Sequence, residues 1–188
     1  MEDEVSGKLS VILPSYNEEA MIRMTSAALA DILARENIPF ELLFVDDGSS
    51  DGTWREIQAA SQADGRVRGV SFSRNFGKEA AIFAGLSNAE GDCCAVMDCD
   101  LQHPPEKLVE MYRLWQQGYE IVEGVKSDRG RETPMRRFGA RCFYSIISSA
   151  IHIDMSRASD FKLMDRKAVD VLLTIREKHA FFRALSSW

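Results

Sequence analysis

The fold is decided at residues 93–102, which are Cys93-Cys94-Ala95-Val96-Met97-Asp98-Cys99-Asp100-Leu101-Gln102. An apolar run of strand length ends there in two acids one residue apart, and alternate residues of a strand face the same side. Ligands of open α/β sheets bind at the carboxyl ends of the strands. We therefore expect Asp98 and Asp100 to hold a hard cation, Mg²⁺ or Mn²⁺. Two such acids could also solvate a turn or cap the next helix.

Apolar runs alternate with segments of helical pattern along the whole chain. Strands are expected at about 9–13, 40–45, 67–72, 93–97, 121–125 and 159–164, and helices at about 18–35, 53–63, 79–88, 104–118, 134–151 and 166–175. We expect Pro14 to end the first strand and Asn17, followed by Glu18 and Glu19, to begin the first helix. This order predicts a single α/β domain, Rossmann-like, with a mostly parallel sheet and helices on both faces.

Several classes of protein are excluded. The first strand-to-helix turn is Pro14-Ser15-Tyr16-Asn17-Glu18, which lacks the G-x-G-x-x-G of nicotinamide-dinucleotide sites, and no Walker glycine loop is present. The net charge of -6 argues against a nucleic-acid partner. The four cysteines have no zinc-type spacing and are expected to be core residues in a reducing compartment.

The segment from Lys126 to Arg141 is locally basic, with six cations against Asp128 and Glu132. Such a segment could be a solvated face or could receive a phosphate group. No apolar run approaches the roughly 18 residues that span a bilayer, so this chain is expected to be soluble as it stands.

Five motifs occur in the order seen in family 2 glycosyltransferases. They are Pro14-Ser15-Tyr16-Asn17-Glu18, Val45-Asp46-Asp47-Gly48-Ser49, Arg74-Asn75-Phe76-Gly77-Lys78, Asp98-Cys99-Asp100-Leu101-Gln102-His103-Pro104-Pro105 and Ser159-Asp160-Phe161. The chain resembles most closely the polyprenyl-phosphate branch, which includes dolichyl-phosphate mannose synthase and the bactoprenol glucosyltransferases. The resemblance covers about residues 8–188.

This resemblance implies a GT-A fold and transfer of a hexose, with inversion, from a nucleotide sugar to a polyprenyl phosphate. It also implies roles for residues at matching positions. The nucleoside pocket would be lined by Pro14, Tyr16, Glu18 and Asp47, with Asp46 close by, and Mg²⁺ or Mn²⁺ and the donor diphosphate would be surrounded by Asp98, Asp100 and Gln102. The acceptor phosphate would be held by Lys126, Arg137 and Arg141, and Asp160 would lie near the reacting centre. Asp100 and Asp160 are thus the candidate catalytic residues.

Two interpretations are open for several of these residues. A lipid phosphate is already anionic at neutral pH, so Asp160 is expected to orient the sugar or a basic side chain more than to accept a proton; it could also be an ordinary strand-edge acid. Lys78 either binds substrate or solvates a helix start. Asp46 could serve only its turn, and His103 could reach the metal or be a first-turn polar residue.

The resemblance also divides the chain into a donor and metal half, about residues 8–125, and an acceptor half, about residues 126–188. Beyond Trp188, members of this branch continue into acceptor-loop residues, amphipathic helices and often membrane spans, so a membrane region is expected to be absent from this chain. The intact protein is expected to lie on the cytoplasmic face of a membrane, and it could be a homo-oligomer.

Three other functions share some of these motifs. A glycosyltransferase with a glycan or soluble acceptor would share the donor motifs. A haloacid-type phosphatase also places Asp-x-Asp after an apolar strand, although Leu101 and Gln102 depart from its usual pattern. A non-catalytic domain that binds nucleotide sugars is the third.

Overall fold

The structure, a computed structural model, describes residues 7–124 and 160–174. Within these ranges one sheet has the strand order β3-β2-β1-β4-β6-β5. The strands are β1 (Leu9–Ser15), β2 (Phe40–Asp46), β3 (Val67–Ser71), β4 (Cys93–Val96), β5 (Ile121–Glu123) and β6 (Lys162–Asp165). β1 to β4 pair in parallel, whereas β6 runs antiparallel to both of its neighbours, β4 and β5. The prediction of a mostly parallel α/β sheet is confirmed.

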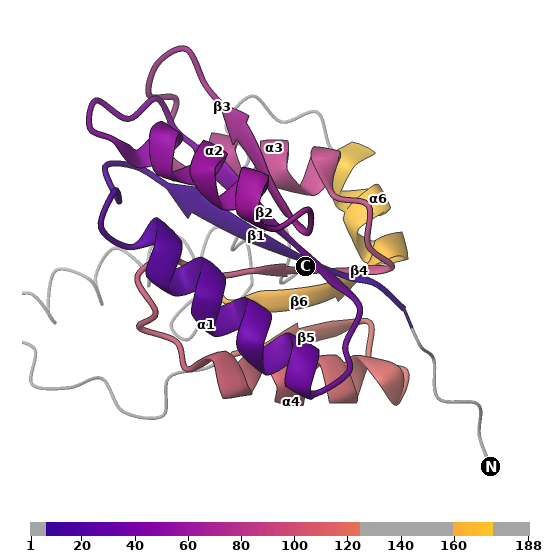
Figure 1. Cartoon of the computed structure of the whole chain (residues 1–188). Coiled ribbons are helices and arrows are strands. Elements are labelled where there is room, and N and C mark those ends of the chain that lie inside the picture. Colours follow the sequence, from indigo (N-terminus) through magenta and orange to yellow (C-terminus); the bar gives the residue numbers. More distant parts are fainter. Residues whose placement is uncertain (1–6, 125–159, 175–188) are drawn as a thin grey trace, which may run out of the picture.

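Helices cover both faces of this sheet. They are α1 (Ile22–Arg35), α2 (Thr53–Ala63), α3 (Lys78–Asn88), α4 (Pro105–Gln116) and α6 (Arg166–Thr174). Figure 1 shows α1 and α4 on one side of the sheet and α3 and α6 on the other. Side chains of a strand alternate between faces, so Leu9, Val11 and Leu13 join the core under α1, α2 and α4. Ile12 joins the core under α3 and α6.

The strand order reverses at β1. The chain builds outward from β1 to β2 and β3, and then crosses back to place β4 on the other side of β1. Such a reversal opens a crevice at the carboxyl ends of the two strands, where ligands bind in open α/β sheets. The segments that leave β1 and β4 therefore flank the same crevice.

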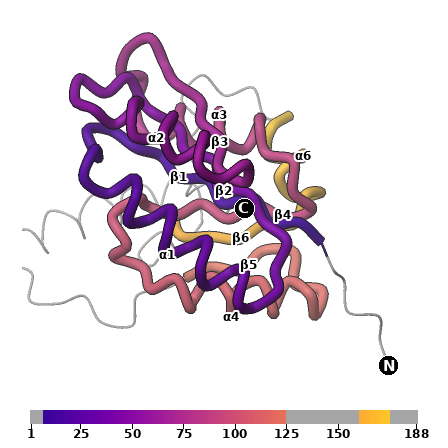
Figure 2. Tube along the Cα trace, viewed as in Figure 1, coloured from indigo at the N-terminus to yellow at the C-terminus, as the bar shows by residue number. Residues whose placement is uncertain are grey.

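β6 brings a late part of the chain to this crevice. Its register pairs Val96, the last residue of β4, with Lys162, the first residue of β6. The Cα trace in Figure 2 shows β4 and β6 side by side near the middle of the molecule. Asp160 consequently lies beside the loop that follows β4.

The prediction that Pro14 ends the first strand is wrong, because β1 continues to Ser15 and pairs there with Asp46 of β2. The backbone N–H and C=O groups of even-numbered β1 residues point toward β4, as the hydrogen bond from Met97 N to Ile12 O shows. The β4 ladder ends at Ile12, so the missing N–H of Pro14 interrupts no pairing.

The first helix begins at Ile22 and not near Glu18. Asn17 has a φ of 55°, and the backbone N–H groups of Glu18 and Glu19 donate to Thr53 Oγ1 and Asp51 Oδ2 instead of entering a helix. Side chains of the loop before α2 and of its first residue thus hold residues 17–19 in a turn. By contrast, α2 begins and ends where it was predicted. The helix predicted at 134–151 lies outside the described residues.

Candidate functional site

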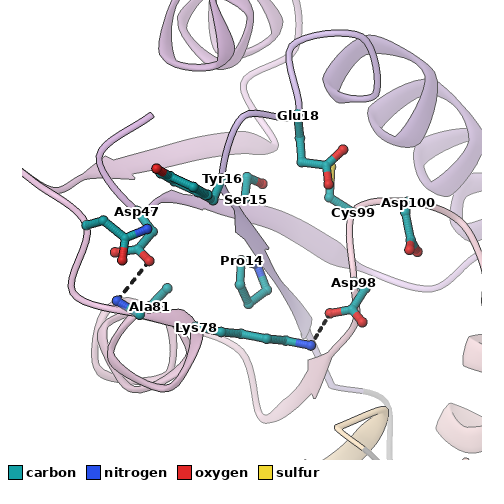
Figure 3. A pocket seen from close by; sticks show the side chains of 12 residues that line it. Pro14, Ser15, Tyr16, Glu18, Asp47, Lys78, Ala81, Asp98, Cys99 and Asp100 are labelled. Atoms are coloured by element: carbon teal, nitrogen blue, oxygen red, sulfur yellow. Dashed lines mark hydrogen bonds and ion pairs between the residues drawn. The ribbon is translucent and has the colours of Figure 1, made fainter. Parts of the chain in front are cut away.

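A pocket of about 320 Å³ lies at the carboxyl ends of β1, β2 and β4 (Figure 3). Seven of the residues that the sequence singled out line it: Pro14, Tyr16, Glu18, Asp47, Lys78, Asp98 and Asp100. They come from four separate segments of the chain. The switch in strand order brings these segments together, as expected for an open α/β sheet.

The two acids after β4 sit in a tightly held loop. Asp100 Oδ1 accepts a hydrogen bond from the backbone N–H of Gln102 at 3.0 Å, and Leu101 has a φ of 55°. On the helix side, Thr25 Oγ1 of α1 donates to the carbonyl oxygen of Cys99 at 2.6 Å. The loop is therefore anchored between the two acids, and both face the pocket.

Lys78 connects this loop to Asp160. Its Nζ lies 2.5 Å from Asp98 Oδ1 and 2.9 Å from Asp160 Oδ2. Burial by itself would lower the pKa of the Lys78 ammonium, but the two carboxylates raise that pKa above its ordinary value. Lys78 is thus a cation shared by two acids of the site.

The pocket carries an excess of negative charge around Glu18. Burial, and then the carboxylates of Asp100, Asp51 and Asp98, raise the pKa of Glu18 above its ordinary value. Carboxylates that repel one another in this way are the ligand type a hard divalent cation prefers. Within residues 7–124 and 160–174, no group of three or more His, Cys, Asp or Glu side chains is arranged as a metal centre.

Asp47 organises the opposite wall of the pocket. Its Oδ1 accepts from the backbone N–H of Phe76 at 2.7 Å and its Oδ2 from that of Gly77 at 2.9 Å. These bonds hold the loop that leads into α3, with Gly77 at a φ of 97°. Tyr16, an aromatic residue that is 48% exposed to solvent, also lines the pocket (Figure 3). The wall thus offers a carboxylate and an aromatic face.

Asp46 has the contacts of a turn residue. It is buried, its Oδ1 accepts from the backbone N–H of Ser49, and its Oδ2 accepts from Ser71 Oγ. It is adjacent to Asp47 but does not line the pocket. Its hydrogen bonds therefore stabilise the loop between β2 and α2.

Other predicted site residues lie away from the pocket or outside the described ranges. Gln102 is exposed and does not line the pocket. His103 stacks on Phe161, with ring centroids 4.6 Å apart, and so contacts the residue next to Asp160. Lys126, Arg137 and Arg141 lie outside the described residues.

Five lining residues had no role assigned from the sequence: Ser15, Asn75, Gly77, Ala81 and Cys99. Ser15, Asn75, Gly77 and Cys99 belong to the five motifs shared with family 2 glycosyltransferases, so their position in those motifs was the available signal. Ala81 is a small residue without a distinctive chemistry. Only the packing of α3 against β1 places it at the pocket.

The mostly parallel sheet with an acid pair at its switch point has the arrangement of a GT-A glycosyltransferase domain. The profile described as Glycosyl transferase family 2 matches residues 10–173. The chain belongs to this family, as its motifs indicated.

Three similar proteins illustrate the match. The uncharacterized glycosyltransferase YkcC of Bacillus subtilis is 41% identical over 180 residues, covering 95% of this chain and 56% of YkcC. The bactoprenol glucosyl transferase of Shigella phage SfV is 34% identical, with coverages of 96% and 59%. The solved mannosyltransferase PcManGT of Pyrobaculum calidifontis, in complex with GDP-Man and Mn²⁺, has a TM-score of 0.60 at 21% identity, with coverages of 89% and 47%. The chain thus spans little more than half of the curated relatives it matches.

The helices within residues 7–124 and 160–174 are all too short or too polar to cross a membrane.

Proposed function

We propose that the protein is a metal-dependent, inverting glycosyltransferase that moves a hexose from a UDP- or GDP-linked sugar to a polyprenyl phosphate. The observation that carries the proposal is the meeting of Asp98 and Asp100 with Glu18 and Asp47 in one pocket at the switch point of the sheet. Family membership sets aside the phosphatase alternative. The division into a donor half before residue 126 and an acceptor half after it belongs to the same proposal.

Two comparisons support the substrates. PcManGT was solved with GDP-Man and Mn²⁺, which supports a nucleotide-sugar donor and a divalent cation. The relative from phage SfV is named a bactoprenol glucosyl transferase, which supports a polyprenyl acceptor.

The chemistry requires charge stabilisation at the leaving group. Breaking the bond between sugar and diphosphate leaves negative charge on the diphosphate, and a divalent cation bound there stabilises that charge. Asp98 and Asp100 would hold the cation, since both face the pocket from one anchored loop. Tyr16 and Asp47 would bind the nucleoside on the opposite wall, the tyrosine by its ring and the aspartate by its carboxylate.

The acceptor needs orientation more than activation. The second ionisation of a phosphate monoester lies near pH 6, so the attacking oxygen is already anionic at neutral pH. Asp160, held by Lys78, would therefore orient groups near the reacting centre. Lys126, Arg137 and Arg141 would hold the acceptor phosphate, and their basic segment would face anionic lipid on the cytoplasmic side of a membrane.

Calorimetric titration of UDP-glucose and of GDP-mannose, each with Mn²⁺ and with a chelator, tests the donor site. We expect one donor to bind only with Mn²⁺, and Asp100→Ala to weaken that binding about tenfold or more, a loss of at least roughly 1.4 kcal/mol. Asp31→Ala is the matched control, because Asp31 pairs with Arg35 on the exposed side of α1. Its donor binding should equal that of the unchanged chain.

Binding that is indifferent to the chelator, or to Asp100→Ala, would contradict the metal assignment. The acceptor is tested on the intact protein by comparing polyprenyl phosphate with soluble glycans. Transfer to a glycan alone would replace the proposed acceptor, and tight donor binding without any transfer would indicate a sensor of nucleotide sugars.

A further inference from the structure

Lys78 joins two acids that are distant in sequence and belong to different parts of the site. Asp98 follows β4, and Asp160 precedes β6, yet both carboxylates contact the same ammonium nitrogen, at 2.5 Å and 2.9 Å. Figure 3 shows the Lys78 side chain extending along the pocket to Asp98. The contact pairs the proposed metal ligand with the proposed orienting acid through one side chain.

The position of Lys78 is fixed by the backbone on its amino side. Lys78 is the first residue of α3, and the two residues before it donate their backbone N–H groups to Asp47. The segment just before them is also confined, because an ideal Cβ on Gly48 would lie 2.3 Å from the carbonyl carbon of Arg74. The lysine is therefore brought to the acids by a loop that hydrogen bonds to Asp47 and close backbone packing hold in place.

The environment of the ammonium is asymmetric. The Asp160 side chain is 10% exposed, whereas those of Asp98 and Lys78 are 37% and 40% exposed. Water screens the pair with Asp98 more than the pair with Asp160. The bond to Asp98 is thus the one that another cation can replace most readily.

A divalent cation at Asp98 and the Lys78 ammonium would compete for one carboxylate. Two cations that contact the same carboxylate lie close enough to repel each other, even in a partly hydrated pocket. The geometry points to Lys78 as a positioning residue that holds Asp98 until a divalent cation binds there and keeps Asp160 oriented in both states. This inference rests on the proposed function, because it takes Asp98 as a ligand of the cation.

The competition predicts shifts of opposite sign in two variants. Lys78→Met removes the competing charge, so the affinity for Mn²⁺ should rise about twofold to fivefold, the range for a solvent-exposed ion pair. Asp160→Asn leaves the ammonium with Asp98 as its remaining charged partner, so the affinity for Mn²⁺ should fall by about the same factor. A lysine that only supports the fold would produce no gain in affinity on removal.

The measurement is a titration of Mn²⁺ into the chain without nucleotide, followed by the electron paramagnetic resonance signal of the free ion. Lys78→Arg keeps the competing charge on a group of different shape, so its affinity for Mn²⁺ should stay below that of Lys78→Met. Lys107→Met is the matched control, because Lys107 pairs with Glu110 on the exposed side of α4. Thermal unfolding of each variant verifies that it is folded. If Lys78→Met is unstable, the direction of the change in Mn²⁺ affinity is tested by Asp160→Asn, with Lys78→Arg as the variant that keeps the charge.

Unchanged or weaker Mn²⁺ binding in Lys78→Met would overturn the inference, and so would tighter binding in Asp160→Asn. If the unchanged chain still binds a sugar nucleotide only with Mn²⁺, the proposed function survives that failure. If the unchanged chain binds no Mn²⁺ with or without nucleotide, both the inference and the metal dependence of the proposed function fail.

Discussion

Gly48 lies where the loop after β2 meets the loop before α3. Its φ is 67°, a left-handed conformation that glycine adopts without steric cost. An ideal Cβ there would come within 2.3 Å of the Arg74 carbonyl carbon and 2.7 Å of the Asn75 nitrogen. Both obstacles are backbone atoms, which cannot rotate away as a flexible side chain can. The approach of the two loops, and so the placement of Lys78, depends on the absence of a side chain at this one position.

Gly48→Ala should therefore destabilise the domain by about 2 kcal/mol or more, from the left-handed backbone and the contact with Arg74. Urea unfolding measures this change. Gly65→Ala is the control, because no atom beyond its chain neighbours lies within 4 Å of its Cβ position. The free energy of unfolding of this variant should change by less than about 0.5 kcal/mol. Equal stability of the two variants would show that the two loops can separate without cost.

At the scale of the elements, Glu41 ties the amino ends of four strands together. This β2 residue is 1% exposed and accepts hydrogen bonds from Ser10 Oγ of β1, the backbone N–H of Glu90 before β4, and Arg68 Nη1 of β3. Lys8 adds an ion pair at 3.2 Å. Burial would raise the pKa of Glu41, but these donors together lower it to about 2. The network lies at the end of the sheet opposite the pocket.

This network predicts a specific acid sensitivity. Because the folded pKa of Glu41 lies below its ordinary value of 4.5, its stabilisation is fully present above pH 4.5 and is lost as the pH falls toward 2. At neutral pH, Glu41→Gln should lower the free energy of unfolding by roughly 2 to 3 kcal/mol. The difference between variant and unchanged chain should shrink between pH 4.5 and pH 2.

Urea unfolding at several pH values measures this difference. Glu110→Gln, which breaks an exposed pair with Lys107 on α4, should change stability by less than about 0.5 kcal/mol. A Glu41→Gln difference that stays constant from neutral pH to pH 2 would show that the network does not stabilise the charged form. Donor binding should be retained, because Glu41 does not line the pocket.

Considered as a whole, the molecule is joined across its middle by β4. This strand pairs with β1 on one side and with antiparallel β6 on the other. Arg166, at the start of α6, donates to the carbonyl oxygens of Ala89 and Gly91 just before β4. Trp115 of α4 donates to Asp165 Oδ2 at 2.8 Å. Opening β4 therefore requires both sides of the sheet to separate.

Labelling of the three buried cysteines measures this opening. Cys93, Cys94 and Cys99 are buried, and burial raises the thiol pKa of Cys94 and of Cys99 to about 11. Thiolates are the reactive form, so all three should resist iodoacetamide in the folded chain and react once urea unfolds it. Mass spectrometry of labelled peptides measures each site. Rapid labelling of Cys94 in the folded chain would show that β4 opens locally, without global unfolding.

The alternation of strands and helices, the acids at the strand ends and the family could all be predicted from the amino-acid sequence alone. These properties are local: an apolar run such as 93–97 specifies a buried strand, and acids directly after it must lie at the strand's end. Even a precise local prediction, such as the bounds of α2, needed nothing beyond neighbouring residues.

Which of these residues contact one another depends on the tertiary structure. The Lys78 contact with Asp160 joins residues 82 positions apart, and it exists because β6 lies beside β4 while α3 begins over the same crevice. Pro14 stays in a strand and Glu18 stays out of a helix for the same kind of reason, since distant partners replaced their local preferences. Local patterns do not encode strand order, and strand order places the charges of this site within contact distance.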